Sequence, residues 1–315
     1  METATRMAKR GSSNRMISKL FRRKKQSVEA REPSIEAVEP LVFESNDNEP
    51  TLLSPVSQAC TQAQMDEPPF FRWCQEIGEE ARYHRKQWEF CYILQALYLN
   101  GMLAPEKSGL GFGVGAEPLV SLIAEYGASV LATDLAPRRA RRAGWVESEQ
   151  HAKNKAALNE RNLCEDEAFE KLVSFRYVDM NVIPDDLSGQ FDFCWSACAF
   201  EHLGSIRNGL EFVENSVKTL RPGGLAVHTT EFNCSYDDET LDRKSTVLFR
   251  RQDFIRLAER LRDQGYIIDF NFNLGDQPLD KYIDVAPYDP DTHLKLQLEK
   301  WVTTSFGLLI RKPQD

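Results

Sequence analysis

Short apolar segments and helix-length amphipathic segments alternate along most of this chain. A buried strand is expected just before residue 111, and further strands are expected at 130–134, 175–180, 191–196, 225–230, 266–273 and 304–310. Helical patterns separate them, as at 118–126, 147–163 and 253–264. This alternation predicts an α/β fold with a mostly parallel seven-stranded sheet and helices on both faces.

Two further segments carry candidate functional groups. Residues 70–104 predict N-terminal helices whose aromatic side chains suit a core, and whose Arg82, His84 and Arg85 suit a substrate lid. Residues 274–291 are rich in Asp and Pro and are too long for a tight hairpin, so they are a candidate active-site loop.

The beginning of the chain has a different composition. Residues 1–25 hold nine Lys and Arg against one Glu, whereas residues 26–69 hold nine Asp and Glu against one Arg. Such a segment cannot bury enough apolar surface to offset its ordering entropy. We therefore expect a disordered charged N-terminal tail over 1–69 and a folded domain over 70–315, with its core at 105–315. The apolar and basic side chains of 16–25 could contact a membrane surface or an acidic partner; a solvated tail is the alternative.

A glycine-rich loop follows the first expected strand. Gly111, Gly113 and Gly115 let the backbone turn sharply and approach a ligand, and the helix after them offers free N–H groups to an anion. Asp134 and Asp179 end the second and third strands, and ligands bind at the carboxyl ends of strands in open α/β sheets. Asp134 could accept hydrogen bonds from both hydroxyls of a ribose. The pattern predicts a nucleotide-type cofactor site.

The order of these motifs, continued by 191–203 and by the turn at 220–224, resembles the class I S-adenosylmethionine-dependent methyltransferases over 105–312. The resemblance implies a Rossmann-like methyltransferase domain over 70–315 and S-adenosylmethionine as the cofactor. It implies that Gly111, Gly113 and Gly115 form the cofactor loop, that Asp134 binds the ribose, that Asp179 and Met180 bind the adenine, and that Ser196 faces the methionine part. The family often has an acid where Gly109 stands here, so the cofactor's ammonium group is left to backbone carbonyls or to Glu117.

A general base is needed only if the methyl acceptor must lose a proton. His202 is the first candidate because it follows the fourth strand and titrates near neutrality, although it could simply shape the pocket. Glu231 and His228 are its rivals on the fifth strand, and we expect both on one face of that strand. Tyr236 and Asp237, in the next loop, could also reach a substrate.

The net charge and the absence of certain sequence signatures narrow the class of methyl acceptor. The formal net charge is −9, and the expected catalytic domain is itself acidic, which argues against broad nucleic-acid binding. The signatures with which resembling enzymes methylate nucleic-acid bases are absent. The prediction is methyl transfer to an unidentified small molecule or glycan; the alternatives are a nicotinamide-dependent oxidoreductase and a non-catalytic cofactor-binding scaffold.

The cysteines and the hydropathy of the chain indicate in which cellular compartment the protein is expected. Seven cysteines without a Cys-x-x-Cys pair indicate reduced thiols, and no apolar run reaches the length that spans a bilayer. A cytoplasmic protein is expected. Cys194, Cys198 and His202 could suggest a metal site, but none is predicted because both cysteines fall in or near a buried strand. The sequence leaves the oligomeric state open.

Overall fold

Five parallel strands form the centre of the fold in the computed structural model, which describes residues 48–138, 154–243 and 245–314. These strands are β3 (Ser108–Phe112), β4 (Ser129–Asp134), β5 (Val173–Tyr177), β6 (Phe191–Ala197) and β7 (Leu220–Asn233). Their order is β5-β4-β3-β6-β7, so the direction of winding reverses between β3 and β6. Such a reversal leaves a crevice at the carboxyl ends of the strands, where ligands bind in open α/β sheets.

Antiparallel and short strands extend the sheet beyond β7. The long strand β15 (Trp301–Arg311) pairs antiparallel with β7 along nine residue pairs. The short ones are β1 (Ser57–Ala59), β10 (Ile267–Ile268), β11 (Phe270–Asn271), β12 (Ile283–Asp284) and β14 (Lys295–Leu298). The α/β class and the parallel centre are confirmed, but the main sheet has eleven strands where seven were expected, and it is partly antiparallel.

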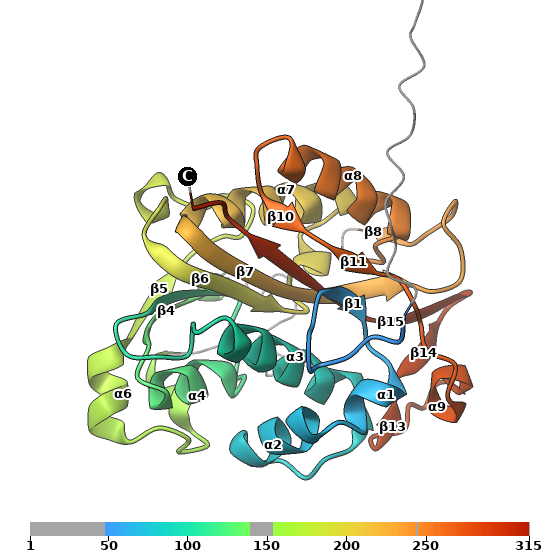
Figure 1. Ribbon diagram of the computed structural model, residues 1–315, viewed down its shortest axis with the longest axis horizontal. Helices are drawn as coiled ribbons and strands as arrows, with labels where there is room; N and C mark the ends of the chain where they lie inside the picture. The colour runs from blue at the N-terminus through green and yellow to red at the C-terminus, as the bar shows by residue number, and fades with distance from the viewer. Residues whose placement is uncertain (1–47, 139–153, 244, 315) are drawn as a thin grey trace, which may run out of the picture. The chain divides into compact units, whose positions relative to one another are not determined.

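Helices cover both faces of the sheet (Figure 1). On one face lie α7 (Ile206–Ser216) and α8 (Arg251–Arg262), and on the other lie α2 (Pro68–Glu76), α3 (Arg85–Leu99) and α4 (Leu119–Glu125). Successive strand residues point to opposite faces. Phe193 and Trp195 therefore pack with α3, while Cys194 packs with the α7 side.

The remaining elements are short. They are α1 (Gln62–Met65), α6 (Asp166–Leu172), α9 (Pro278–Lys281), β8 (Asp242–Arg243), β9 (Thr246–Val247) and four 3-10 turns at Ala156–Asn159, Asp185–Leu187, Phe200–His202 and Val217–Thr219. The helix expected at 147–163 lies partly outside the described residues, and its described end holds only the first of these turns. None of the helices in the described ranges is both long and apolar enough to span a bilayer.

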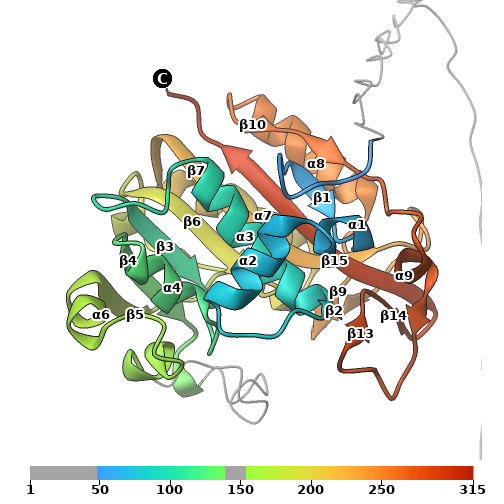
Figure 2. The same ribbon diagram turned by 60° about the horizontal axis from the view of Figure 1, so that its bottom comes forward.

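A two-stranded sheet joins the start of α3 to the C-terminal part of the chain. β2 (Tyr83–His84) pairs in parallel with β13 (Thr292–His293), which puts His84 opposite His293. Figure 2 shows β2 and β13 close together beside one end of α3. The segment expected to form an active-site loop, 274–291, therefore lies beside the segment expected to form a lid.

The boundary of the tail, expected at residue 69, is placed too late. β1 lies between β15 and β11, and Leu52, Ala59 and Cys60 are buried. The polar composition of this segment predicted a tail because buried amides cannot be recognised from sequence. In the fold these amides form hydrogen bonds with one another and with the backbone, as where Gln58 donates to Gln64 Oε1 at 2.6 Å. The rest of the expected tail, 1–47, lies outside the described residues.

Two truncations should separate the folded segment from the charged one. Removal of 1–47 should leave thermal stability nearly unchanged, because the sheet keeps β1. Removal of 1–66 should lower the free energy of unfolding by about 3 kcal/mol or more, because it removes β1 and exposes the apolar groups beneath it. Chemical denaturation of both variants beside the full chain measures the difference. Equal stability of the two truncated proteins would contradict a structural role for β1.

Candidate functional site

A cavity of about 670 Å³ opens where the carboxyl ends of the central strands meet the start of α3. Most of the residues predicted from the sequence line it: Gly113, Gly115, Glu117, Asp134, Asp179, Met180, His202 and Glu231. The remaining three, Gly111, Ser196 and His228, are not among its lining residues. Arg82, His84 and Arg85, from the expected lid, also line it.

The glycine loop is held closely against neighbouring strands. Gly113 has φ 59°, a left-handed conformation that side chains rarely adopt. A Cβ there would lie 3.1 Å from Ala199 Cβ and 3.2 Å from Met180 Sδ. Val114 N donates to Thr133 O at 3.1 Å. The loop can therefore present backbone at close range, and a side chain at Gly113 would crowd the cavity wall.

Two acidic strand ends face the same cavity. Asp134 is 8% exposed; its Oδ2 accepts a hydrogen bond from Gly115 N at 3.2 Å and its Oδ1 one from Leu135 N at 2.6 Å. Asp179 Oδ1 accepts from Asn181 N at 3.0 Å. The backbone thus fixes the orientation of both carboxylates at the carboxyl ends of adjacent strands.

Gly111 and Ser196 have structural roles instead of the predicted contact with a cofactor. A Cβ on Gly111 would lie 2.5 Å from Val114 Cγ1 and 2.6 Å from the Trp195 ring, so the glycine makes room for packing. Ser196 is fully buried, and its Oγ lies 2.9 Å from His228 Nδ1. The cavity wall at this strand is formed by the next residues, Ala197, Cys198 and Ala199.

His228 cannot act as a base on a ligand in this cavity. Its Nε2 lies 3.0 Å from Ser216 Oγ, and that hydroxyl already donates to Val213 O, so His228 Nε2 carries a proton and Nδ1 accepts from Ser196. Burial lowers the pKa of His228 to about 3, which keeps the ring neutral. The expectation that His228 and Glu231 share a face of the strand is wrong, because residues three positions apart point to opposite faces.

Glu231 belongs to a group of charges at the start of α3. Its Oε1 lies 2.5 Å from Arg85 Nη1, and its Oε2 accepts from Thr303 Oγ1 at 2.8 Å. Cys198, Glu201 and Glu231 can bring one ligand atom each within 4.8 Å of one another. Arg85 already neutralises the charge of Glu231. The group is therefore an ion pair between Arg85 and Glu231, with Cys198 and Glu201 beside it.

Glu117 is the second carboxylate that α3 engages. Lys86 Nζ lies 3.0 Å from Glu117 Oε1 and 3.0 Å from Glu89 Oε2. Burial raises the pKa of Glu117 to about 7 despite the lysine. Its Oε2 atom is buried without a hydrogen-bond partner in the described part of the chain. A cationic group of a ligand could donate a hydrogen bond to this Oε2 atom.

The end of β6 supplies the wall between these two groups. Cys198 has φ 44°, an uncommon conformation for a residue with a side chain, and burial raises the pKa of its thiol. Glu201 is 1% exposed and accepts from Thr230 Oγ1 at 3.0 Å, and burial raises its pKa. His202 Nδ1 lies 2.8 Å from Ser245 O and therefore carries a proton; its Nε2 lies 3.8 Å from Glu201 Oε1.

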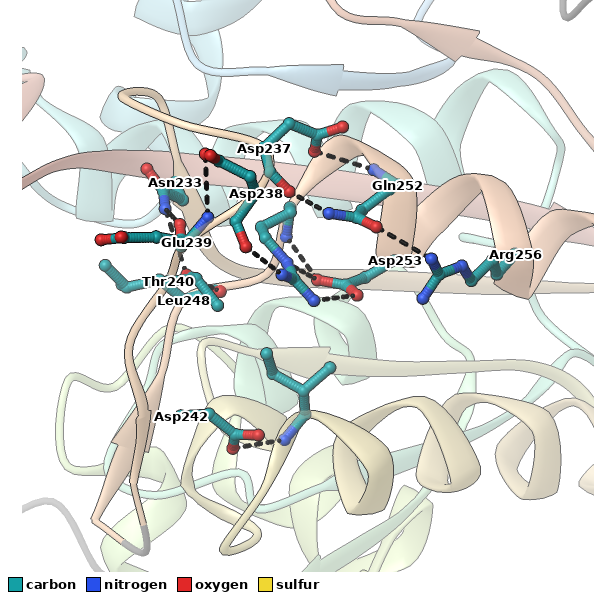
Figure 3. A network of polar contacts seen from close by, with 12 residues as sticks. Asn233, Asp237, Asp238, Glu239, Thr240, Asp242, Leu248, Gln252, Asp253 and Arg256 are labelled. Atoms are coloured by element: carbon teal, nitrogen blue, oxygen red, sulfur yellow. Dashed lines mark hydrogen bonds and ion pairs between the residues drawn. The ribbon is translucent and has the colours of Figure 1, made fainter.

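The loop after β7 does not reach the cavity. Figure 3 shows it held against the start of α8: Gln252 N donates to Asp237 Oδ1 at 3.1 Å, and Asn233 Nδ2 donates to Glu239 O at 2.9 Å. Tyr236 and Asp237, which were expected to approach a substrate, are not among the lining residues.

Sequence reasoning missed His293 as a functional residue, although it lies only two positions beyond the expected active-site loop. It lines the cavity, and its Nδ1 lies 2.5 Å from Asp284 Oδ2. A His and an Asp within a loop rich in Asp gave the sequence no distinguishing signal. The pairing of β2 with β13 brings them to the cavity.

Part of the chain matches a known protein family. Residues 110–228 match a family model described as "Methyltransferase domain". No curated protein matches the chain. Similar solved structures include magnesium protoporphyrin IX methyltransferase from Synechocystis PCC 6803 with bound SAH, at 11% identity and TM-score 0.42 over 80% of this chain and 97% of that one. A SAM-dependent methyltransferase from Methanosarcina mazei shows 14% identity and TM-score 0.42 over 69% and 98%.

The residues of the cavity suit the cofactor of this family. The left-handed Gly113 brings backbone close to a ligand, Asp134 presents a fixed carboxylate, and Glu117 keeps a buried oxygen without a hydrogen-bond partner in the described ranges. These groups fit a nucleoside that carries a cationic amino acid. The match to a methyltransferase domain over 110–228, together with these groups, supports a class I S-adenosylmethionine-dependent methyltransferase with S-adenosylmethionine as its cofactor.

Proposed function

We propose that this chain transfers a methyl group from S-adenosylmethionine to a small polar molecule or a glycan. The observation that carries the proposal is the division of one cavity into two parts. Gly113, Asp134 and Met180 line the part beside β3, β4 and β5, whereas Arg85 and Glu231 line the part beside β7. The second part offers charged and hydrogen-bonding groups in a partly enclosed space, which suits a small acceptor with polar groups.

The protein's contribution to such a reaction is binding, alignment and exclusion of water. When bound, S-adenosylmethionine supplies an electrophilic methyl group on a sulfonium sulfur. Asp134 would hold its ribose, Asp179 and Met180 its adenine, and Glu117 its ammonium group. Arg85 and Glu231, which neutralise each other, line the second part without adding a net charge to it. In-line transfer then depends mainly on how precisely the acceptor is positioned.

We also propose that the protein acts in a reducing compartment such as the cytoplasm. All seven cysteines are free thiols, and five of them are buried. A peripheral membrane contact through the basic residues 16–25 stays a proposal, since these residues lie outside the described ranges. Nothing observed favours a nicotinamide cofactor.

Cofactor titration combined with a transfer assay tests the proposed function. Calorimetry of the full chain should show binding of S-adenosylmethionine and S-adenosylhomocysteine but not of NADH. Labelled S-adenosylmethionine should then yield labelled product with a mixture of small metabolites and glycosides. Binding without transfer to any acceptor would support the scaffold alternative, and binding of NADH alone would support an oxidoreductase.

Asp134→Ala tests the ribose contact. It should weaken S-adenosylhomocysteine binding by about 1.5–3 kcal/mol, because two charge-assisted hydrogen bonds are lost. Asp186→Ala is the control, since Asp186 is an exposed acid paired with Arg176 far along the chain from the loop. Equal affinities of the two variants, measured by calorimetry, would remove the ribose role.

The raised pKa of Glu117 predicts that cofactor binding depends on pH. With its pKa at about 7, a large fraction of Glu117 is protonated near neutrality in the free protein. An ammonium group favours the ionised carboxylate, so binding of S-adenosylhomocysteine should release a proton and tighten severalfold between about pH 6 and about pH 7.5. Calorimetry in buffers of different ionisation enthalpy measures the proton. Glu117→Gln should abolish its release, whereas Glu125→Gln, an exposed change at the end of α4, the helix that follows Glu117, should not.

His202 should shape the pocket and not act as the base. Its Nδ1 is bound to Ser245 O, and an amide at this position can keep that contact. His202→Asn should therefore retain much of the turnover with an unchanged pH profile. A loss of about 10⁴-fold at unchanged cofactor affinity would instead identify His202 as the base.

A further inference from the structure

Two histidines form one wall of the cavity. His84, the last residue before α3, and His293 of β13 are paired in register, and their ring centroids lie 4.9 Å apart with an interplanar angle of 29°. Both line the cavity. Because 209 positions separate them in the sequence, only the pairing of β2 with β13 brings them together.

The hydrogen bonds of His84 fix its protonation. Lys86 N donates to His84 Nδ1 at 3.1 Å, so Nδ1 must present a lone pair. Burial lowers the pKa of His84 to about 4, with further lowering from the neighbouring His293. The ring is therefore neutral near pH 7 and carries its proton on Nε2, which makes that atom a hydrogen-bond donor.

The hydrogen bonds of His293 fix the opposite arrangement. Its Nδ1 lies 2.5 Å from Asp284 Oδ2, so Nδ1 carries a proton that it donates to the carboxylate. Asp284 is 2% exposed and is itself held by Asp289 N at 3.0 Å. In the neutral ring His293 Nε2 is then an acceptor. A carboxylate that orients an imidazole in this way is the arrangement that makes histidine an effective general base.

Neither Nε2 atom has a hydrogen-bond partner within the ranges that the structure describes. The wall therefore offers one donor and one acceptor to a ligand in the cavity. A hydroxyl group is complementary to this pair, because it accepts through its oxygen and donates its proton.

The sheet order places this wall on the acceptor side. Leu294, next to His293, accepts a hydrogen bond from Thr304 of β15 at 2.7 Å, and the following residue Ser305 pairs with Glu231 of β7. The cofactor residues Gly113 and Asp134 lie just after β3 and at the end of β4, and β6 separates these two strands from β7. The transferred methyl group lies between these two sides if the acceptor binds beside the histidines.

We propose that His84 and His293 bind the acceptor through a hydroxyl group and that His293, oriented by Asp284, is the general base of an O-methylation. The inference rests on the proposed function. In the step, the acceptor oxygen forms a bond to the methyl carbon while the carbon–sulfur bond breaks. The electron pair of the broken bond stays on sulfur, which changes from a sulfonium to a thioether. The hydroxyl proton passes to His293 Nε2 and later to solvent. Asp284 is a positioning residue, and His84 donates to the bound oxygen.

The transfer assay should use the full chain, labelled S-adenosylmethionine, and methyl glycosides of hexoses and deoxyhexoses beside the corresponding amino sugars. Label should appear as an O-methyl ether. His293→Gln should lower kcat by about 10²–10⁴-fold with cofactor affinity unchanged within about twofold. Asp291→Asn, an exposed change in the same segment, is the matched control and should behave like the unaltered protein.

A measurement without turnover tests the same assignment. Nitrogen-detected NMR of the histidine rings should show the proton of neutral His293 on Nδ1 and that of His84 on Nε2, with resonances assigned from His84→Gln and His293→Gln. Asp284→Ala should remove the preference for Nδ1 at His293, because the acceptor of that proton is lost.

Three results would overturn the proposal: label on nitrogen only or on none of the alcohols, undiminished kcat in His293→Gln, or a proton on Nε2 of neutral His293. Calorimetry keeps these results distinct from failure of the proposed function. If S-adenosylmethionine binds, the cofactor assignment holds and the acceptor assignment alone has failed; absence of binding would refute the proposed function itself.

Discussion

The contact between Arg85 and Glu231 organises the site. It joins the first turn of α3 to the end of β7 at 2.5 Å, and both side chains are largely buried. Arg85 also donates to Ser305 Oγ at 3.3 Å, so the same guanidinium reaches β15. Removing one partner of a buried ion pair commonly costs about 3–5 kcal/mol, because the other charge remains without compensation. The contact therefore anchors the start of α3 to β7 and β15.

Several features depend on where α3 begins. His84 immediately precedes the helix. Lys86, in its first turn, contacts both Glu89 of the same helix and Glu117 after the glycine loop. β2 is fixed by the same segment, and β13 pairs with β2. A shift of the helix along the sheet would separate both the lysine from Glu117 and the two histidines from the ion pair. The cofactor side and the acceptor side are thus coupled through one helix terminus.

Local patterns predicted the parallel centre of the sheet and the acids at its carboxyl ends, because strand, loop and acid are neighbours in sequence. They could not predict β1, whose polar amides are satisfied by one another after folding. His293 and Asp284 were missed because their significance depends on a strand paired across more than two hundred positions. Ser196 was assigned from the order of the motifs, and His228 from an expected alternation of side chains along the fifth strand. Both side chains are buried on the face of the sheet away from the cavity, where they contact each other.

The two parts of the cavity have different origins in the chain. The loop glycines, Asp134 and Asp179 all fall within 110–228, the segment that matches the methyltransferase domain. Arg85, Glu231 and His293 fall outside it, on α3, on the end of β7 and on the segment before β15. In the proposed function, binding of the cofactor depends on the first set, and recognition of the acceptor depends on the second. The family therefore identifies the methyl donor, while the acceptor has to be inferred from the chemistry of residues that the family match does not include.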